Sequence, residues 1–414
     1  MWVRAGRVVL ALLVVCGALA ACGSQQADSG IYAWGYNGFG QLGTGNTTDA
    51  KLPVASVSGG DIADENPIAV SSGANHVCAL VQGGRVYCWG DNSHGQLGNG
   101  TNTSSSDPVQ VDPGGALSGK SITWISAGGN HTCAVAVPGN VFCWGDNTYG
   151  ELGNGSTNDS NVPVRVNTTS HFGNSSIRQV HLGYNHTCAV NTGGSVFCWG
   201  DNESGQLGNA SLSSSSKAVV TLPPPDELTD LVSVISAGGN NSCELTNRGT
   251  AYCWGDNSRG QLGNGNMQSS STPTAVAGSG VLGTTKVAAI SVGASHACAV
   301  TRTAGVACWG GNSQGQVGNG NTTDQLKPVA VSTQNGISGA PFLFVTSGGF
   351  HTCAWTSAGR AYCWGANGFG QLGNGTDTGS SVPTEVVTAK TSLNGRTAQQ
   401  LSAGDNFTVE LAVP

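Results

Sequence analysis

The sequence predicts an all-β chain folded as a seven-bladed β-propeller with four-stranded antiparallel blades, closed because its N- and C-terminal strands share one blade. A Trp-Gly dipeptide recurs seven times, paired cysteines recur six times, and the chain after residue 29 shows no sustained helical period of 3.6 residues. The Trp-Gly tryptophans follow one another at a constant interval of 55 residues: Trp34, Trp89, Trp144, Trp199, Trp254, Trp309 and Trp364. Such a period, with several short strands in each copy, is typical of a solenoid, a propeller or an array.

Composition excludes several classes of protein. Only 9% of the 414 residues are charged and the formal net charge is -7, so the chain lacks the clustered Lys and Arg that neutralise nucleic-acid phosphates. The 10 Trp argue against intrinsic disorder, and 65 Gly without a triplet period argue against a collagen-like rod. We therefore expect a globular protein with no nucleic-acid partner.

Residues 1–21 have the pattern of a secretory signal peptide. Arg4 and Arg7 precede a short apolar run, and the Leu-Ala-Ala-Cys segment that ends at Cys22 looks like a bacterial lipobox, whose cysteine receives a lipid. The alternative is an ordinary signal peptide that happens to precede a cysteine, but Cys22 has no partner among the recurring cysteine pairs. The pattern predicts lipidation of Cys22, a tether over residues 22–29, and a protein held to a membrane outside the cytoplasm only by that lipid.

Residues 30–414 have the length of seven 55-residue copies, and each copy has the same order of segments. A Trp-Gly motif is followed by a strand that usually contains Pro, a variable Ser/Thr/Gly stretch, an apolar segment and a hairpin with cysteines. In one copy, residues 127–135 and 141–145 are short runs rich in β-branched and aromatic residues, and Pro138-Gly139-Asn140 between them favours a turn. Strands that are apolar on both faces suit blades that pack against a neighbour on either side.

Twelve cysteines fall in pairs whose members are ten residues apart. On adjacent antiparallel strands of a hairpin the two members lie opposite each other, with Cα atoms about 4.5–5.5 Å apart, a separation that a disulfide can span. A metal site or free buried thiols are the alternatives, but zinc ligands usually come in closer C-x2–4-C spacings. We expect six sequential disulfides: Cys78–Cys88, Cys133–Cys143, Cys188–Cys198, Cys243–Cys253, Cys298–Cys308 and Cys353–Cys363.

The remaining copy lacks both cysteines. Its equivalent positions are Ala33 and Val409, which stand at opposite ends of the chain and lack cysteine together. If the first and last strands pair, a single cysteine there would be an unpaired thiol in an oxidising compartment, so the joint absence is consistent. An open solenoid would instead leave exposed strand edges that invite aggregation. The pattern predicts a ring in which the two chain ends complete one blade.

The recurring motif Trp-Gly-x-Asn-x-x-Gly-Gln-Leu-Gly-x-Gly, with Gly-x-x-His-Thr before the next strand, resembles the regulator of chromosome condensation repeat family from Gly30 to Pro414. The resemblance implies a seven-bladed propeller with a shared blade and a function chiefly as an interaction platform, without identifying the target. The family includes nuclear exchange factors, whose setting does not suit a secreted acidic chain, and a secreted bacterial branch with inhibitors of β-lactamases, which remains compatible.

A third branch, the plant ultraviolet photoreceptors, carries Trp directly after the Gly of Gly-x-x-His-Thr. The equivalent positions of this chain hold other residues: Ala74, Gly129, Tyr184, Gly239, Ala294 and Gly349. No tryptophan cluster of that kind is therefore expected.

Several recurring side chains have a structural explanation that we prefer to a ligand site. Five histidines could suggest a ring of metal ligands, but Asn241 and Phe407 replace two members, so we expect histidines bonded to neighbouring backbone: His76, His131, His186, His296 and His351. Four aspartates faintly resemble a Ca2+ loop but lack its bidentate Glu: Asp91, Asp146, Asp201 and Asp256. The Asn three residues after each Trp is expected to cap a turn, and the Trp itself to form core between blades rather than a sugar-stacking surface.

Function is then expected in what differs between blades. Exposed aromatic and Arg side chains on the loops are the binding candidates: Tyr36, Phe39, Tyr149, Tyr184, Arg259, Phe350 and Phe369. We expect a monomeric, non-enzymatic scaffold in the cell envelope, without metal or cofactor, that binds another protein or a cell-surface polymer. Two alternatives stay open, a secreted inhibitor of a β-lactamase or cell-wall enzyme and a polysaccharide hydrolase or lyase.

Overall fold

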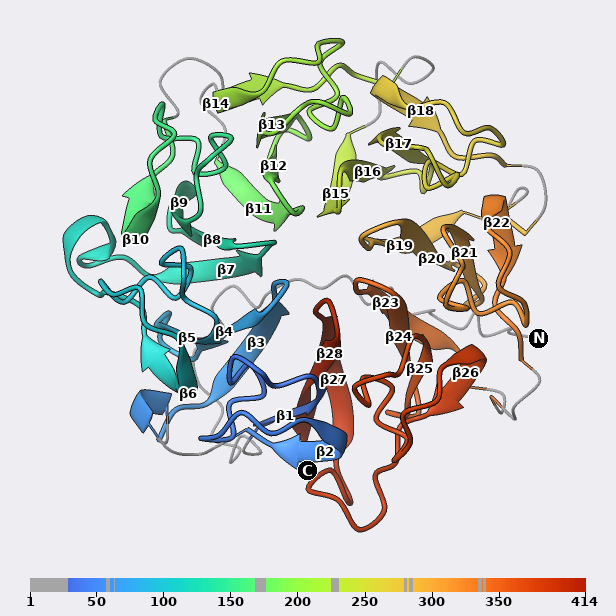
Figure 1. Cartoon of the computed structure of the whole chain (residues 1–414). Helices are drawn as coiled ribbons and strands as arrows, with labels where there is room; N and C mark the ends of the chain where they lie inside the picture. Colours follow the sequence, from blue (N-terminus) through green and yellow to red (C-terminus); the bar gives the residue numbers. More distant parts are fainter. Residues whose placement is uncertain are drawn as a thin grey trace, which may run out of the picture.

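A computed structural model of the chain contains a ring of seven four-stranded antiparallel sheets, which confirms the predicted all-β propeller (Figure 1). It describes residues 29–56, 60–62, 64–167, 176–224, 231–278, 281–282, 286–333, 337 and 340–414. Helical structure in these residues is limited to two short 3-10 segments, η1 (Gly60–Ile62) and η2 (Gly115–Leu117). None of the helices in this part of the chain has the length and apolar character to cross a membrane. The predicted signal peptide and the lipidation site Cys22 lie outside the described residues.

We number the blades 1 to 7 around the ring, beginning with the blade that contains both chain ends. Blade 1 consists of β1 (Gly30–Gly35), β2 (Ala50–Ala55), β27 (Thr397–Ala403) and β28 (Phe407–Val413). Blades 2 to 4 consist of β3 (Pro67–Ser72), β4 (His76–Val81), β5 (Val86–Gly90) and β6 (Ser105–Gln110); β7 (Ile122–Ala127), β8 (His131–Ala136), β9 (Asn140–Gly145) and β10 (Ser160–Arg165); β11 (Ile177–Leu182), β12 (His186–Asn191), β13 (Val196–Gly200) and β14 (Ser215–Val220). Blades 5 to 7 consist of β15 (Val232–Gly238), β16 (Asn241–Thr246), β17 (Ala251–Gly255) and β18 (Ser270–Ala275); β19 (Val287–Val292), β20 (His296–Thr301), β21 (Val306–Gly310) and β22 (Gln325–Ala330); β23 (Phe342–Ser347), β24 (His351–Thr356), β25 (Ala361–Gly365) and β26 (Ser380–Glu385).

The strands of each blade run outward from the central axis in chain order, for example β3-β4-β5-β6, while blade 1 has the order β27-β28-β1-β2 (Figure 1). Because neighbouring strands are antiparallel, the loop between the first and second strand opens on the same end of the ring as the loop between the third and fourth strand. The second of these loops carries the Trp-Gly motif. We call this end of the ring the motif face, and the contact between two consecutive blades a seam.

Pairing of the first and last strands closes the ring as predicted. β1 and β28 are antiparallel over six Cα pairs, from Gly30 opposite Ala412 to Gly35 opposite Phe407. Within this register Ala33 lies opposite Val409, which places the two non-cysteine positions face to face. Blade 1 is therefore built from both ends of the chain. Because β1 pairs with β28, neither of these two strands presents a free edge to the other chain end.

The other six blades each contain the expected disulfide between their second and third strands. All twelve cysteines are fully buried, and each is bonded to the cysteine ten residues along the chain. The Cα atoms of each pair are 4.0–4.1 Å apart, somewhat closer than we expected for a hairpin of this kind. Each disulfide thus closes a short local loop inside one blade.

The seven motif tryptophans lie between blades, as predicted, and are fully buried. The indole Nε1 of Trp144 donates a hydrogen bond of 2.9 Å to the carbonyl oxygen of Gln96 in the preceding blade, and the same bond recurs at every seam. Gly98 has a φ of +66° and a Cβ added there would lie 2.6 Å from that Nε1 atom, so the glycine leaves room for the indole. The hydrophobic core is therefore divided among the seams rather than gathered at the centre.

Candidate functional site on the motif face

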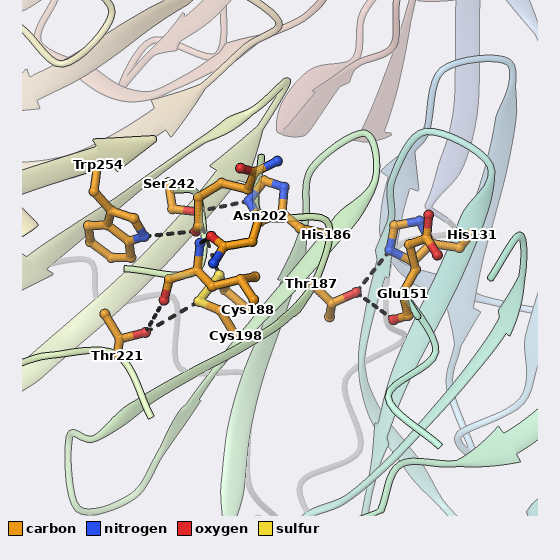
Figure 2. The surroundings of a disulfide bond; sticks show 12 residues. His131, Glu151, His186, Thr187, Cys188, Cys198, Asn202, Thr221, Ser242 and Trp254 are labelled. Atoms are coloured by element: carbon orange, nitrogen blue, oxygen red, sulfur yellow. Dashed lines mark hydrogen bonds between the residues drawn. A yellow bond between two sulfur atoms is a disulfide. The ribbon is translucent and has the colours of Figure 1, made fainter. Parts of the chain in front are cut away.

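The recurring histidines join adjacent blades through side-chain hydroxyls, which corrects the expectation that they bind neighbouring backbone. His186 Nε2 lies 2.8 Å from Ser242 Oγ of the next blade (Figure 2). The hydroxyl in turn donates to the backbone carbonyl of Gln206, 3.1 Å away. Four further pairs have the same arrangement: His76–Thr132, His131–Thr187, His296–Thr352 and His351–Thr408. The difference arises because the hydroxyl belongs to the next copy of the repeat, 56 or 57 residues along the chain, and only the packing of two blades brings it to the imidazole.

Burial keeps these imidazoles neutral. It lowers the pKa of His131, His186 and His296 to about 3, and that of His76 and His351 to about 4. Because each hydroxyl donates its proton to a carbonyl, it accepts a hydrogen bond from the imidazole, which assigns the ring proton to Nε2. The histidines are therefore structural groups of the seams and not a ring of metal ligands.

The recurring Asn residues brace the motif loops over a longer span than the local turn we expected. Asn92 Oδ1 accepts from the backbone N–H of Leu97, and its Nδ2 donates to the carbonyls of Thr101 and Thr103. Residues up to eleven positions away are thus tied to one buried amide. This cross-bracing holds the loop rigid and sets the position of the exposed side chains on the motif face.

One loop position decides what is presented at each seam. It lies five residues after the motif Trp: Phe39, His94, Tyr149, Ser204, Arg259, Gln314 and Phe369. The side chains of His94, Arg259 and Phe369 contact the motif loop of the next blade. At the seam between blades 7 and 1, the ring of Phe369 lies 4.9 Å from that of Tyr36, centroid to centroid. Tyr36 also contacts Phe39, with 6.3 Å between ring centroids. Three of the predicted binding residues therefore form one cluster.

Phe350 lies on the same motif face, in the loop between β23 and β24 of blade 7. Its carbonyl accepts a hydrogen bond of 2.8 Å from the backbone N–H of Ala366, at the start of the loop that carries Phe369. Phe39, Phe350 and Phe369 are 39%, 46% and 40% exposed, values that are high for large apolar side chains. We call Tyr36, Phe39, Phe350 and Phe369 the aromatic patch.

The other three predicted binding residues lie elsewhere. Tyr149 is 39% exposed on the motif loop of blade 3. Arg259 is engaged at the seam between blades 5 and 6, where its guanidinium lies 3.6 Å from the carboxylate of Asp324. Neither residue belongs to the aromatic patch.

Tyr184 lies in an inner loop of blade 4 and reaches across the ring to blade 1. Its hydroxyl donates a hydrogen bond of 2.8 Å to the carboxylate of Asp405. Burial and this carboxylate raise the pKa of Tyr184, and burial raises the pKa of Asp405. Tyr184 thus ties two distant blades together near the axis, and its contact with Asp405 could not be foreseen from residues 221 positions apart.

One group of potential ligands could not be assembled from the sequence, where Asp146 was considered only as part of a possible Ca2+ loop. His94 from blade 2 lies beside Asp146 and Asp159 from blade 3, and their ligand atoms are all within 4.8 Å of one another. The signal available was a single Glu, Glu151, at a motif position where the other six copies have Gln. The residues escaped notice because they come from two different copies of the repeat.

Comparison with known proteins agrees with this architecture. The Ultraviolet-B receptor UVR8 of Arabidopsis thaliana is 33% identical over 322 residues, which are 77% of this chain and 69% of the receptor. The human E3 ubiquitin-protein ligase HERC2 is 28% identical over 392 residues, but these represent only 8% of that protein's length.

Two solved structures show the same fold. Prp20p from Saccharomyces cerevisiae has a TM-score of 0.80 at 23% identity, with 94% of this chain and 92% of that chain covered. Human WBSCR16 has a TM-score of 0.79 at 20% identity, with 93% and 99% covered. Residues 30–410 match the RCC1-like domain, and the chain therefore belongs to the RCC1-like propeller family.

Proposed function

We propose that this protein is a binding scaffold that engages a protein partner through the aromatic patch on its motif face. The observation that carries the proposal is the gathering of Tyr36, Phe39, Phe350 and Phe369 on two neighbouring blades, with three of the four rings about two-fifths exposed. Large aromatic side chains that protrude from a rigid surface are the residues most often responsible for protein–protein affinity. RCC1-like propellers are chiefly interaction scaffolds, which supports a binding role rather than a catalytic one.

We also propose that the scaffold is monomeric and lies outside the cytoplasm, anchored by a lipid on Cys22. Six buried disulfides suit an oxidising compartment, because cytoplasmic thiols are usually kept reduced. The Leu-Ala-Ala-Cys segment ending at Cys22 supplies the motif for attachment. Mass spectrometry of the purified protein is expected to show cleavage before Cys22 and a diacylglycerol on it, and light scattering to show one copy per particle.

The binding role is tested by site-specific photocrosslinking in intact cells. A photoreactive phenylalanine analogue replaces Phe369 in the aromatic patch, or Val137 as the matched control. Val137 is 55% exposed in a hairpin between the second and third strands of blade 3, at the opposite end of the ring. We expect a discrete protein adduct at Phe369 and none at Val137.

The outcome separates the alternatives. Adducts of equal yield at both positions, or none at either, contradict the patch as a binding site. An adduct that is destroyed by polysaccharide-degrading enzymes but not by protease shows that the ligand is a cell-surface polymer and overturns the assignment to a protein.

A further inference from the structure

Two carboxylates and one imidazole come together at the seam between blades 2 and 3. His94 Nδ1 lies 3.3 Å from Asp159 Oδ2, and Asp146 offers a third ligand atom within 4.8 Å of both. His94 and Asp159 are partly exposed, so ions in solution can reach them. His94 comes from the loop after β5, whereas both aspartates come from the loop after β9, so the group spans two blades.

Glu151 places a buried carboxylate next to this group, because its Oε2 accepts the backbone N–H of Tyr149 as the Oε1 of Gln96 accepts the N–H of His94 in blade 2. Glu151 is fully buried, and its Oε1 atom has no hydrogen-bond partner. In blades 2, 4 and 5 the Gln at this position donates from Nε2 to the Asp that is equivalent to Asp146, over 2.7–2.9 Å. In blade 3 the same place holds a second carboxylate, which has no proton to donate when ionised. A buried carboxylate beside another carboxylate is stabilised by a proton or by a positive charge near the pair, and a bound cation would supply that charge.

At the seam between blades 5 and 6, the carboxylates are paired with side chains of the protein. There Gln261 pairs with Asp256, and Arg259 supplies a permanent charge to Asp324. At the seam between blades 2 and 3 the residue equivalent to Arg259 is His94, whose imidazole has a nitrogen atom that can coordinate a metal. Compared with the seam between blades 5 and 6, the seam between blades 2 and 3 has His94 in place of Arg259, and Glu151 in place of the Gln found in the other six copies. These two replacements remove a fixed positive charge and add a nitrogen ligand and a carboxylate.

We propose that His94, Asp146 and Asp159 form a divalent-metal site that joins blades 2 and 3 on the motif face, with the buried carboxylate of Glu151 beside it adding negative charge. One imidazole nitrogen with carboxylate oxygens is a ligand set that Zn2+ accepts in tetrahedral sites, whereas Ca2+ and Mg2+ prefer oxygen alone. Zinc ligands lie about 2.0–2.2 Å from the metal, which places them roughly 3.3 Å from one another. The separation of 3.3 Å between His94 and Asp159 already meets this requirement.

Metal binding is tested by calorimetric titration of the full chain, purified in detergent without a histidine tag and alkylated so that no free thiol competes. The titrants are Zn2+, Mn2+, Ca2+ and Mg2+. We expect one equivalent of Zn2+ to bind more tightly than the other ions. Co2+ in place of Zn2+ is expected to give the visible absorption bands of a tetrahedral site.

The repeat itself provides substitutions that keep the fold. Glu151→Gln introduces the residue found in the other six copies, and Asp159→Ser the residue found at this position in blade 2, where Ser104 Oγ accepts the same backbone N–H bond. Each variant is expected to weaken Zn2+ binding at least tenfold without unfolding the protein. Asp324→Ser at the seam between blades 5 and 6 is the matched control and is expected to leave Zn2+ binding unchanged.

Two results overturn the proposal. One is a Glu151→Gln protein that binds Zn2+ as tightly as the natural chain. The other is a natural chain that binds none of the four ions, or that prefers Ca2+ or Mg2+ to Zn2+. The aromatic patch lies at a different seam, so neither result bears on the proposed binding role.

Discussion

Blade 1 and the six other blades have the same four-stranded architecture but are held together differently. Each of the six is continuous in the chain and has a disulfide between its second and third strands. Blade 1 is assembled from both chain ends and has Ala33 opposite Val409 at the equivalent place. Strand pairing and packing therefore form blade 1 without a disulfide.

The seam that follows blade 1 differs from most others in polarity. Phe407 stands where five blades have His, and Val77 of blade 2 stands where their neighbours have Thr or Ser. Both residues are fully buried in one apolar cluster. At the seam between blades 5 and 6, Asn241 likewise replaces His where Ala297 replaces the hydroxyl residue. The comparison teaches that the two sides of a seam change together, since a buried imidazole without its hydroxyl would lose a hydrogen bond.

The largest expected effect is an acid sensitivity that comes from the histidine seams. The pKa of His186 and His296 is lowered to about 3, and that of His76 and His351 to about 4, from 6.5. Below pH 6.5 these histidines are protonated in the unfolded chain but stay neutral in the folded chain. Each histidine therefore lowers the free energy of unfolding by about 1.4 kcal/mol per pH unit as the pH falls. Denaturant unfolding measured from pH 4.5 to 8.5 is expected to show a steep loss of stability on the acid side.

Two buried carboxyl groups change the stability in the opposite direction as the pH rises. Burial raises the pKa of Glu244 and Glu410 from 4.5 to about 8, so stability is lost as the pH rises from 4.5 to 8. The stability maximum is therefore expected near pH 6.5. Combining His296→Phe with Thr352→Val converts one seam to the type that follows blade 1 and should reduce the acid slope, and an unchanged slope would refute this origin.

A disulfide across the closure of blade 1 is expected to give the next largest effect. Ala33→Cys with Val409→Cys introduces the bridge that the other blades have, but it links the two ends of the chain. The loop-entropy estimate gives roughly 6 kcal/mol for so long a loop, against about 3 kcal/mol for the short local loops. Urea unfolding of the oxidised double variant, with each single variant as control, checks this. A gain no larger than that of a local disulfide would contradict it.

Polarity at the seam that follows blade 1 can be reversed. Phe407→His places an imidazole against Val77, which offers it no hydroxyl, and is expected to cost about 2–4 kcal/mol. Adding Val77→Thr restores the partner used at the other seams and should recover part of that loss. A double-mutant cycle by denaturant unfolding measures the coupling between the two positions, and strict additivity would show that they do not act as a pair.

The smallest effect is expected from removing one hydroxyl. Thr352→Val leaves His296 without its partner and removes one of the two donors to the carbonyl of Gln316, at an expected cost of about 1–2 kcal/mol. Thr322→Val on an exposed loop is the control and should change stability by less than about 0.5 kcal/mol. Equal losses of stability in the two variants would show that the hydrogen bond between His296 and Thr352 does not stabilise the seam.

Much of the fold could be predicted because its signals repeat along the chain. The constant spacing of Trp-Gly and of the cysteine pairs predicts the blades, the disulfides and the core between blades, and the joint absence of cysteine at Ala33 and Val409 predicts the closure. The hydroxyl partner of each histidine was missed, because His76 and Thr132 are 56 residues apart and both belong to the same repeating motif. The paired replacements Phe407 with Val77 and Asn241 with Ala297 were the available signal.

The candidate sites were less predictable than the fold. Sequence reasoning selected exposed aromatic residues one by one, and the structure brings Tyr36, Phe39 and Phe369 into contact while it places Tyr184 on Asp405 near the axis. The group around His94 was not recognised, because Asp146 was considered only within its own copy and the three residues meet only across a seam. Sites of this kind depend on variation between copies, whereas the fold depends on what the copies share.

Seven copies of one repeat, each with apolar surfaces on both sides of its sheet, determine that the blades pack against one another, and the joint absence of cysteine at Ala33 and Val409 indicates that the ring closes. The rotation from one blade to the next is a property of the assembled ring, and it alone decides which loop positions of two neighbouring copies touch. It brings Phe369 to Tyr36 and His94 to Asp159, and so it distributes the aromatic patch and the proposed metal site around one face of the molecule.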